Sequence, residues 1–295
     1  GAGGVGVVVA ARHLQLGERV ALKFLLPSAI MSETDVARFT REAQAAVRLK
    51  SEHVARVTDV GALPNGSPYM VMEFLEGVDL GKWVEDNGPL PIPIAVDYII
   101  QACEAVAEAH SLGIVHRDLK PSNLFMTQRP DGSPLIKVLD FGIAKSGESE
   151  GKMNLTRTRS VLGSPVYMSP EQVRSARSVD HRTDIWSLGV CLFELITGRV
   201  PFDGDSVTGV AAAVTSDPVP RLGEYLHGFP PQLEKVLARC LEKKPDARYQ
   251  SVALFAEALA PFGPEHLRLS VDRIAGTLGG RRVITSSGNK TNSRS

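Results

Sequence analysis

In the first quarter of the chain, runs of hydrophobic residues are separated by short polar turns. Four of these runs are rich in β-branched or other apolar residues: 7–11, 19–25, 54–60 and 69–74. Runs of this kind, bounded by turn residues, favour β-strands. Residues 32–49 lie between the second and third runs and have a helical pattern, with a candidate capping box at Ser32 and Asp35. We therefore expect strands and one helix up to about residue 75.

After Gly77 the apolar residues recur at helical spacing. Residues 94–110 show the period of an amphipathic helix, and further helices are expected around 184–197, 231–242 and 251–260. The sequence thus predicts an α+β protein in two lobes: a small, β-rich N-terminal lobe of residues 1–75 and a larger, mainly helical C-terminal lobe of residues 76–263.

The last part of the chain has a different composition. From about Pro264 large apolar residues become rare, and the end is polar and mildly basic. Segments that cannot bury enough apolar surface stay disordered. We therefore expect residues 264–295 to form a flexible linker or tail.

Composition and charge exclude several classes of protein. The 33 basic and 33 acidic residues cancel, so no overall field attracts nucleic acid. The three cysteines are far apart and set in apolar helical patterns, which indicates reduced core thiols in a cytoplasmic protein. The longest apolar stretch, residues 185–197, is too short to span a bilayer. We expect no nucleic-acid partner and no membrane span in this chain.

Three features of the N-terminal part suggest phosphate binding. The glycines of Gly1-x-Gly3-x-x-Gly6 let backbone N–H groups approach phosphate oxygens, although this motif alone is weak. They lead into a strand rather than a helix, which argues against a dinucleotide-binding fold. Lys23 lies on the next predicted strand. A lysine there is usually a solvated edge residue, but Glu42, in the predicted helix, could fix its ammonium group.

The octet His116-Arg117-Asp118-Leu119-Lys120-Pro121-Ser122-Asn123 is the strongest signal. Asp118 can accept a proton from a hydroxyl, Lys120 can neutralise phosphoryl charge, and Asn123 can bind a hard cation. Asp140-Phe141-Gly142 follows a predicted strand and places a second carboxylate where Mg²⁺ could bind. Together the two motifs predict phosphoryl transfer.

Through these motifs the chain resembles the Hanks-type protein kinases, and most closely the eukaryotic-like serine/threonine kinases of bacteria, over about residues 1–262. The resemblance implies ATP and protein serine or threonine hydroxyls as substrates, with Mg²⁺, or alternatively Mn²⁺, as the metal. Asp118 would be the catalytic base and Lys120 would contact the γ-phosphate. Asn123 and Asp140 would hold the metal. The phosphates would lie under Gly1, Gly3 and Gly6 and against Lys23, itself paired with Glu42.

The resemblance also implies an adenine site and a bracing network. The hinge is similar to Met72-Glu73-Phe74-Leu75, with Met72 as gatekeeper. The backbone of Glu73 and Leu75 would bind adenine, and the apolar slot would be formed by Val8, Ala21 and Phe125. Three residues would have structural roles: Asp184 would brace the catalytic loop, and Arg248 would pair with Glu171.

Two departures from the family pattern matter. The first glycine of the loop is residue 1, so the strand that normally precedes it is missing. We therefore expect an unpaired apolar edge at residues 7–9, and either a truncated fragment or a misplaced start. Ser164 stands where most members have threonine, which keeps the hydroxyl. Two rival functions remain: a pseudokinase that binds nucleotide without catalysis, and a small-molecule phosphotransferase of kinase-like fold.

The segment 155–160, Leu-Thr-Arg-Thr-Arg-Ser, indicates regulation. It could be a solvated basic loop. Relatives that have an arginine at the Arg117 position use it to bind an activation-loop phosphate, and Thr156 and Thr158 resemble the autophosphorylated pair of bacterial kinases. We expect autophosphorylation there through a kinase–kinase contact. The kinase domain is expected in the cytoplasm, and the sequence leaves open an anchor in the membrane beyond residue 295.

Overall fold

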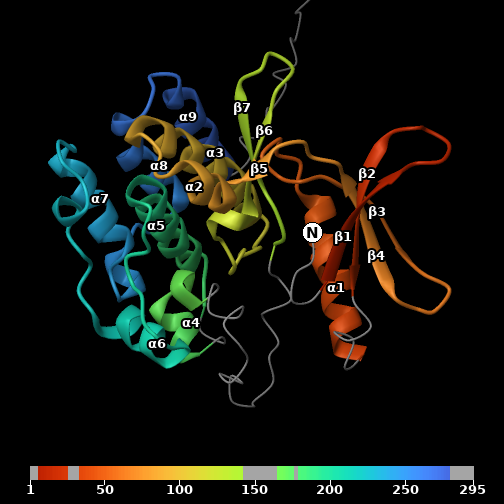
Figure 1. Ribbon diagram of the computed structural model, residues 1–295, viewed down its shortest axis with the longest axis horizontal. Helices are drawn as coiled ribbons and strands as arrows, with labels where there is room; N and C mark the ends of the chain where they lie inside the picture. Colours follow the sequence, from red (N-terminus) through yellow and green to blue (C-terminus); the bar gives the residue numbers. More distant parts are fainter. Residues whose placement is uncertain (1–5, 26–32, 142–164, 176–178, 280–295) are drawn as a thin grey trace, which may run out of the picture.

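The computed structural model describes residues 6–25, 33–141, 165–175 and 179–279, which form two lobes (Figure 1). The smaller lobe contains an antiparallel sheet in the order β1-β2-β4-β3 and one helix. Its elements are β1 (Gly6–Arg12), β2 (Arg19–Leu25), α1 (Glu33–Arg48), β3 (Val57–Ala62) and β4 (Pro68–Glu73). Phe39 and Ala43, one turn apart on α1, pack with Val57 and Met70 of the sheet. The predicted β-rich lobe with one helix is confirmed.

The strand register decides which side chains share a face of this sheet. Val8 lies opposite Lys23, and Ala21 lies opposite Met72. Because residues directly opposite in an antiparallel pair point to the same face, one face carries all four side chains. β1 has β2 as its neighbour and forms one edge of the sheet within the described residues, where Val9 is 39% exposed.

The larger lobe is built around two buried helices. Its elements are β5 (Val78–Asp79), α2 (Leu80–Asn87), α3 (Ile92–Ser111), β6 (Leu124–Gln128), β7 (Pro134–Val138), α4 (Pro170–Arg174), α5 (Arg182–Thr197), α6 (Val207–Ser216), α7 (Pro231–Cys240), α8 (Val252–Leu259) and α9 (Leu267–Leu278). α3 and α5 are apolar on nearly all sides and form the centre of the core, as expected for buried helices. The three cysteines are free and buried in this lobe.

The short sheet β5-β6-β7 lies where the two lobes meet (Figure 1). Gly77, directly before β5, has a φ of 147°, and a Cβ there would clash with the carbonyl oxygen of Met126. Only glycine fits this position. A second junction is formed by the loop between α1 and β3, where Val54 makes a parallel bridge with Val138 of β7.

The prediction of a flexible tail from residue 264 is wrong for α9. Leu267 and Ile274, seven residues apart, form a narrow apolar stripe, and both side chains are buried. One stripe is enough to bury a helix against a larger one, even where large apolar residues are rare overall. Residues 280–295 lie outside the described part of the chain. Among the described helices, none is long and apolar enough to cross a membrane.

Candidate active site

The loop after α3 is fixed by a buried carboxylate. Asp184 of α5 is fully buried and accepts hydrogen bonds from the backbone N–H groups of His116 and Arg117, both at 2.9 Å, and from His110 Nε2 at 2.8 Å. Burial alone would raise the pKa of Asp184, but the hydrogen bond from His110 and the charges nearby lower it below its usual value. Asp184 therefore stays a carboxylate and holds the loop in place.

Two residues at the lobe boundary have unusual backbone angles. Arg117 has a φ of 65° and Asp140 a φ of 48°, and within the described residues they are the non-glycine residues with positive φ. This conformation costs an L-residue roughly 1–3 kcal/mol and is found preferentially at functional sites. Both residues belong to the two motifs that predict phosphoryl transfer.

Asp118, Lys120 and Asn123 lie together in the loop that follows α3. Lys120 Nζ is 3.2 Å from Asp118 Oδ2, and Asn123 Nδ2 donates to the backbone oxygen of Asp118 at 2.8 Å. The backbone oxygen of Asn123 in turn accepts a hydrogen bond from the Leu139 N–H at 2.9 Å, and this bond joins the loop to the end of β7. The three predicted side chains are thus brought to one place, and Asn123 Oδ1 is left as a possible cation ligand.

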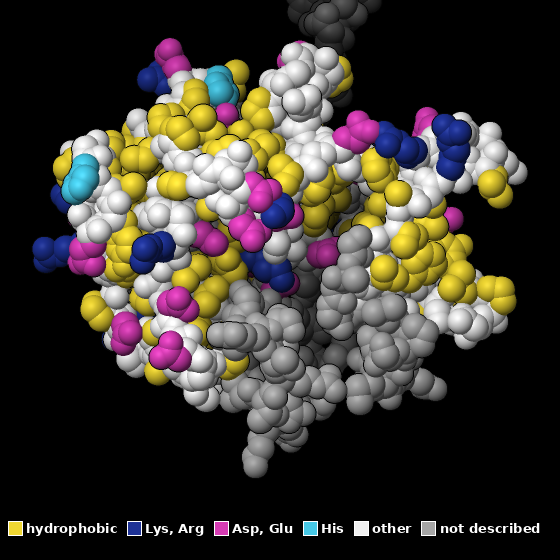
Figure 2. Space-filling model, in the orientation of Figure 1, with side chains coloured by type: hydrophobic (Ala, Val, Ile, Leu, Met, Phe, Trp, Pro, Cys, Tyr) yellow, Lys and Arg dark blue, Asp and Glu magenta, His cyan; other side chains and the backbone are white. Residues whose placement is uncertain are grey.

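Lys23 connects the smaller lobe to Asp140. Its Nζ is 2.9 Å from Glu42 Oε1 on α1 and 2.7 Å from Asp140 Oδ1 after β7. Burial would lower the pKa of Lys23, but the charges of Asp140 and Glu42 outweigh it and raise the pKa. Lys23 therefore keeps an ammonium group in its contacts with Glu42 and Asp140, one from each lobe. Figure 2 shows a hollow between the two lobes on the face that it draws.

The oxygen atoms of Asn123 and Asp140 are suited to a hard cation that also keeps ligands from outside the protein. Asp140 offers a carboxylate and Asn123 an amide oxygen, the atoms that Mg²⁺ prefers. No cluster of three or more His, Cys, Asp or Glu suited to a metal occurs within the described residues. Two protein ligands are sufficient where phosphate oxygens and water complete the coordination.

The predicted adenine slot lies at the junction of the lobes. Val8, Ala21 and Met72 share one face of the sheet with Lys23, and Leu75 follows β4. Phe125 lies on β6 in the adjoining sheet, next to Gly77.

Glu73, which the sequence predicts at the hinge, has a partner that sequence reasoning missed. Its Oε1 lies 2.7 Å from Lys137 Nζ on β7 and accepts from the Arg56 N–H at 2.7 Å. Lys137 stands three residues before Asp140, but its sequence pattern gives no sign of this pair.

The Ser-Pro-Glu segment is held by a buried ion pair. Arg248 is fully buried and contacts both carboxylate oxygens of Glu171 at 2.7 Å. Gln172 was not predicted as important, yet its Nε2 donates to the backbone oxygen of Arg117 at 2.9 Å. A capping-box pattern, Ser169 with Gln172, was the available signal. The segment is therefore tied directly to the loop that carries Asp118.

A basic pocket lies between α1 and the loop after α3. The cavity, about 360 Å³ in volume, is lined by Arg41, Arg48 and Arg117 together with Gln44 and residues 113–115. Sequence reasoning did not include Arg41 in the site. The available signal was its position directly before Glu42, which was a predicted site residue. Three guanidinium groups around one cavity favour a phosphate group.

Several predicted residues fall outside the described part of the chain. These are Gly1, Gly3, Gly142, Thr156, Thr158, Ser160 and Ser164. Gly6 is the one glycine of the predicted phosphate loop that is described, at the start of β1.

Comparison with known proteins gives one consistent family. The protein kinase domain model matches residues 1–259. The serine/threonine-protein kinase Pkn1 of Myxococcus xanthus is 40% identical over 270 residues, which cover 92% of this chain and 38% of that protein. PknB of Mycobacterium tuberculosis is 39% identical over 257 residues, which cover 86% of this chain and 40% of that protein. The chain thus spans about two fifths of the length of these relatives.

The fold also matches a solved kinase structure. The crystal structure of the Mycobacterium tuberculosis PknI kinase domain has a TM-score of 0.68 and 26% sequence identity, and the match covers 88% of this chain and 92% of that one. The two-lobed arrangement with a β-rich N-terminal lobe is therefore shared.

Proposed function

Because this chain belongs to the protein kinase family, we propose that it is a serine/threonine protein kinase that transfers the γ-phosphoryl group of ATP to protein hydroxyls. The observation that carries the proposal is the contact of Lys23 with both Glu42 and Asp140. A nucleotide-binding module without catalysis would not need the Asp118 and Lys120 pair beside this cluster, so catalysis is the better explanation.

The proposed mechanism assigns one task to each polar group. Asp118 accepts the proton of the substrate hydroxyl while the hydroxyl oxygen forms a bond to the γ-phosphorus of ATP. The bond between the γ-phosphorus and the β–γ bridging oxygen breaks, and ADP leaves. Lys120 neutralises charge on the transferred group, and Lys23 holds the remaining phosphates. Asn123 and Asp140 would hold a divalent cation, Mg²⁺ or alternatively Mn²⁺, that supplies further charge neutralisation.

The nucleotide site extends over the rest of the predicted set. Gly1, Gly3 and Gly6 cover the phosphates in this proposal. The adenine lies against Val8, Ala21 and Phe125, and it bonds the backbone of Glu73 and Leu75. The proposed catalytic domain takes in residues 1–263, and its proposed location is the cytoplasm, which the three free, buried cysteines support.

A transfer assay tests the proposal directly. With radiolabelled ATP and casein, we expect label on serine and threonine, identified by mass spectrometry of the products. Lys23→Met should reduce transfer by about 100-fold, because an ammonium group that positions phosphate is lost. Arg129→Met, on the surface of the other lobe, serves as the matched control and should retain activity. No transfer by the unmodified chain would favour a pseudokinase, and label mainly on tyrosine would overturn the residue specificity.

Regulation by autophosphorylation is the second part of the proposal. The pocket of Arg41, Arg48 and Arg117 supports it, because bidentate arginine contacts suit a phosphothreonine. The proposed ligand is phosphorylated Thr156 or Thr158 of the same chain, modified by a second copy of the kinase.

Site mapping of the purified kinase should find phosphate on Thr156 and Thr158. The double variant Thr156→Ala/Thr158→Ala should be roughly tenfold less active than the phosphorylated protein, which corresponds to the loss of one charge-assisted hydrogen bond. Arg41→Gln should reduce the activity of the phosphorylated form while leaving that of the double variant unchanged. If the double variant is as active as the phosphorylated protein, the regulatory proposal fails and the kinase assignment is untouched.

A further inference from the structure

Helix α9 begins after the end of the kinase-family match at residue 259 and packs on α3. Leu267, Ser270 and Ile274 are buried in this contact. The approach is close at Gly263, where a Cβ would lie 2.8 Å from Val96 Cγ1 of α3. α9 is therefore a helix docked on α3, and it lies outside the residues that the protein kinase domain model matches.

A two-bond charged contact joins α9 to α3, in addition to His266 at the start of α9, whose Nε2 is 3.6 Å from Asp97 Oδ2 on α3. Arg273 Nε is 2.8 Å from Glu104 Oε2, and Arg273 Nη2 is 2.7 Å from Glu104 Oε1. Arg273 is 57% exposed, whereas Glu104 is largely buried. Both carboxylate oxygens of Glu104 are thus occupied by one guanidinium group, which approaches from the solvent side.

His53 lies on the inner side of the same carboxylate. This side chain, 1% exposed, is in the loop between α1 and β3, and its Nδ1 is 2.9 Å from the backbone oxygen of Ile136. A carbonyl can only accept, so Nδ1 carries the hydrogen and Nε2 of the neutral ring has a free lone pair. Nε2 is buried and has no hydrogen-bond partner among the described residues.

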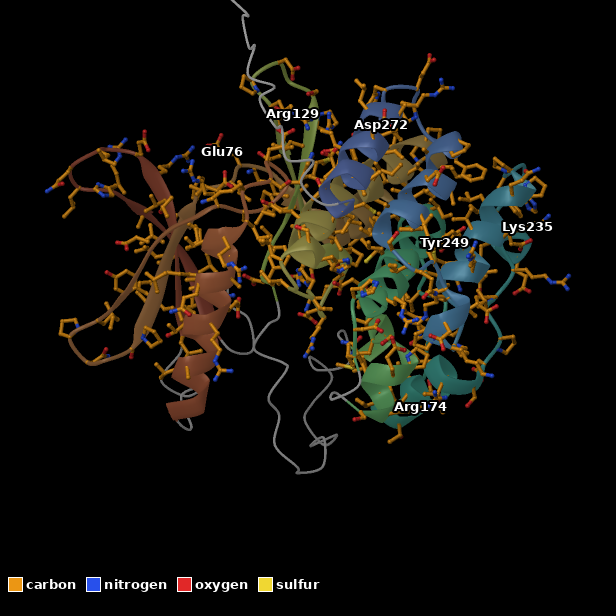
Figure 3. All side chains as sticks on the ribbon, turned by 180° about the vertical axis from the view of Figure 1, so that it is seen from behind. Glu76, Arg129, Arg174, Lys235, Tyr249 and Asp272 are labelled. Atoms are coloured by element: carbon orange, nitrogen blue, oxygen red, sulfur yellow. The ribbon has the colours of Figure 1, made fainter. Side chains whose placement is uncertain are left out.

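The charged groups that face His53 come from four elements. Its Nε2 is 3.7 Å from Glu52 Oε1 in its own loop and 3.8 Å from Glu104 Oε1 on α3. Behind them, Arg129 after β6 contacts Glu52, and Arg273 on α9 contacts Glu104. Figure 3 shows Arg129 at the β6–β7 hairpin and Asp272 on α9 at the same upper edge of the molecule. Both distances to Nε2 are too long for a hydrogen bond.

His53 is also attached to the strand that leads to Asp140. Besides the contact with Ile136, its backbone oxygen accepts from the Val138 N–H at 2.7 Å. A change in the protonation of His53 therefore takes place directly beside β7.

We propose that His53 and Arg273 compete for the Glu104 carboxylate, so that the docking of α9 on α3 depends on the protonation of His53. A proton on Nε2 turns that atom into a donor that faces Glu52 Oε1 at 3.7 Å and Glu104 Oε1 at 3.8 Å. A hydrogen bond to Glu104 requires its carboxylate to move about 1 Å toward Nε2. That movement lengthens the contacts with Arg273, and the two cations repel each other. The inference does not depend on the catalytic proposal.

The direction of the pH dependence follows from the burial of the ring. Burial lowers the pKa of His53 below its usual value, although the Ile136 carbonyl, Glu104 and Glu52 act against this. The ring is therefore neutral at pH 7.5 and takes up its proton below about pH 6.5, the ordinary value for histidine. α9 is held most firmly in the neutral range, and its docking weakens as the pH falls.

The first test is the titration of His53 by NMR in the full chain. Arg273→Met should raise the midpoint of His53 by about half a pH unit, because a competing cation is removed. Arg273→Lys, which keeps the charge, should restore most of the wild-type value. Equal midpoints in wild type and Arg273→Met would overturn the proposal.

The second test measures the docking of α9. Coupling between two sites is reciprocal, so half a pH unit corresponds to a roughly threefold change in the opening of α9. Hydrogen exchange of the α9 amides, corrected for intrinsic rates, should become about threefold faster between pH 7.5 and a pH one unit below the His53 midpoint that the NMR titration gives. His53→Asn keeps a donor for Ile136 and removes Nε2, and this variant should lose the pH effect. An equal pH effect in His53→Asn would contradict the proposal, and the NMR test stands even if that variant folds poorly.

Discussion

Replacing Asp118 with asparagine is expected to lower the turnover number by about 10²–10⁴-fold. Asparagine keeps the size of the side chain but cannot accept the proton of the attacking hydroxyl. The Lys120 ammonium, 3.2 Å from Asp118 Oδ2, would also lose the carboxylate that orients it. Most of the rate in phosphoryl transfer comes from positioning and charge, and both are affected here.

The measurement is steady-state transfer to casein at saturating ATP. The KM for ATP should change little, because the proposed role of Asp118 is at the acceptor hydroxyl rather than at the nucleotide. Asp86→Asn on the exposed face of α2 is the matched control, since it makes the same chemical change in a surface ion pair with Lys82. The thermal unfolding midpoint of both variants should stay near that of wild type. Turnover within a factor of ten of wild type in Asp118→Asn would exclude Asp118 as the base.

Arg248→Met is expected to reduce the free energy of unfolding by about 3–5 kcal/mol. The guanidinium group is fully buried and donates hydrogen bonds to both carboxylate oxygens of Glu171 and to the backbone oxygens of Arg182 and Glu242. It also lies over the ring of Trp186 in a cation–π contact. Methionine fills part of the volume but leaves the Glu171 carboxylate buried without a counter-charge. The loss of one partner of a buried pair is much more costly than the loss of the whole pair.

Urea denaturation of the Arg248→Met, Glu171→Gln and double variants separates these contributions. The double variant should be more stable than the sum of the single changes predicts, because it no longer buries an unpaired charge. Lys82→Met in the exposed pair with Asp86 is the control, and it should change the free energy of unfolding far less than Arg248→Met does, because solvent screens the exposed pair. A loss below about 1 kcal/mol in Arg248→Met would show that the buried pair contributes little to stability.

The fold could be predicted in outline because its signals are local. The strands around Lys23 and the long helix before Asp118 each show their period in consecutive residues. The grouping of Asp118, Lys120 and Asn123 was predictable for the same reason, since all three lie in one octet. Pairing of Lys23 with Glu42 was expected from the family resemblance, and the structure places the two atoms 2.9 Å apart.

The remaining contacts could not be predicted because they join distant segments. Lys137 of β7 and Glu73 of β4 meet only in the folded chain, and no pattern in either segment records that contact. His110 reaches Asp184 from the last turn of α3 for a similar reason. α9 was missed because composition averaged over residues 264–295 concealed a stripe of a few buried side chains.

The two junctions between the lobes have a mechanical consequence. One is the hinge before Gly77, and the other is the loop at Val54, where Ala55 N–H donates to Val138 O at 3.1 Å and Val138 N–H donates to His53 O at 2.7 Å. If these two places are the main points of attachment, the motion expected between the lobes is a rotation about the line that joins them. Lys23 lies on one side of that line and Asp140 on the other, and their contact at 2.7 Å spans the two lobes. Any such rotation would therefore change the length of this contact.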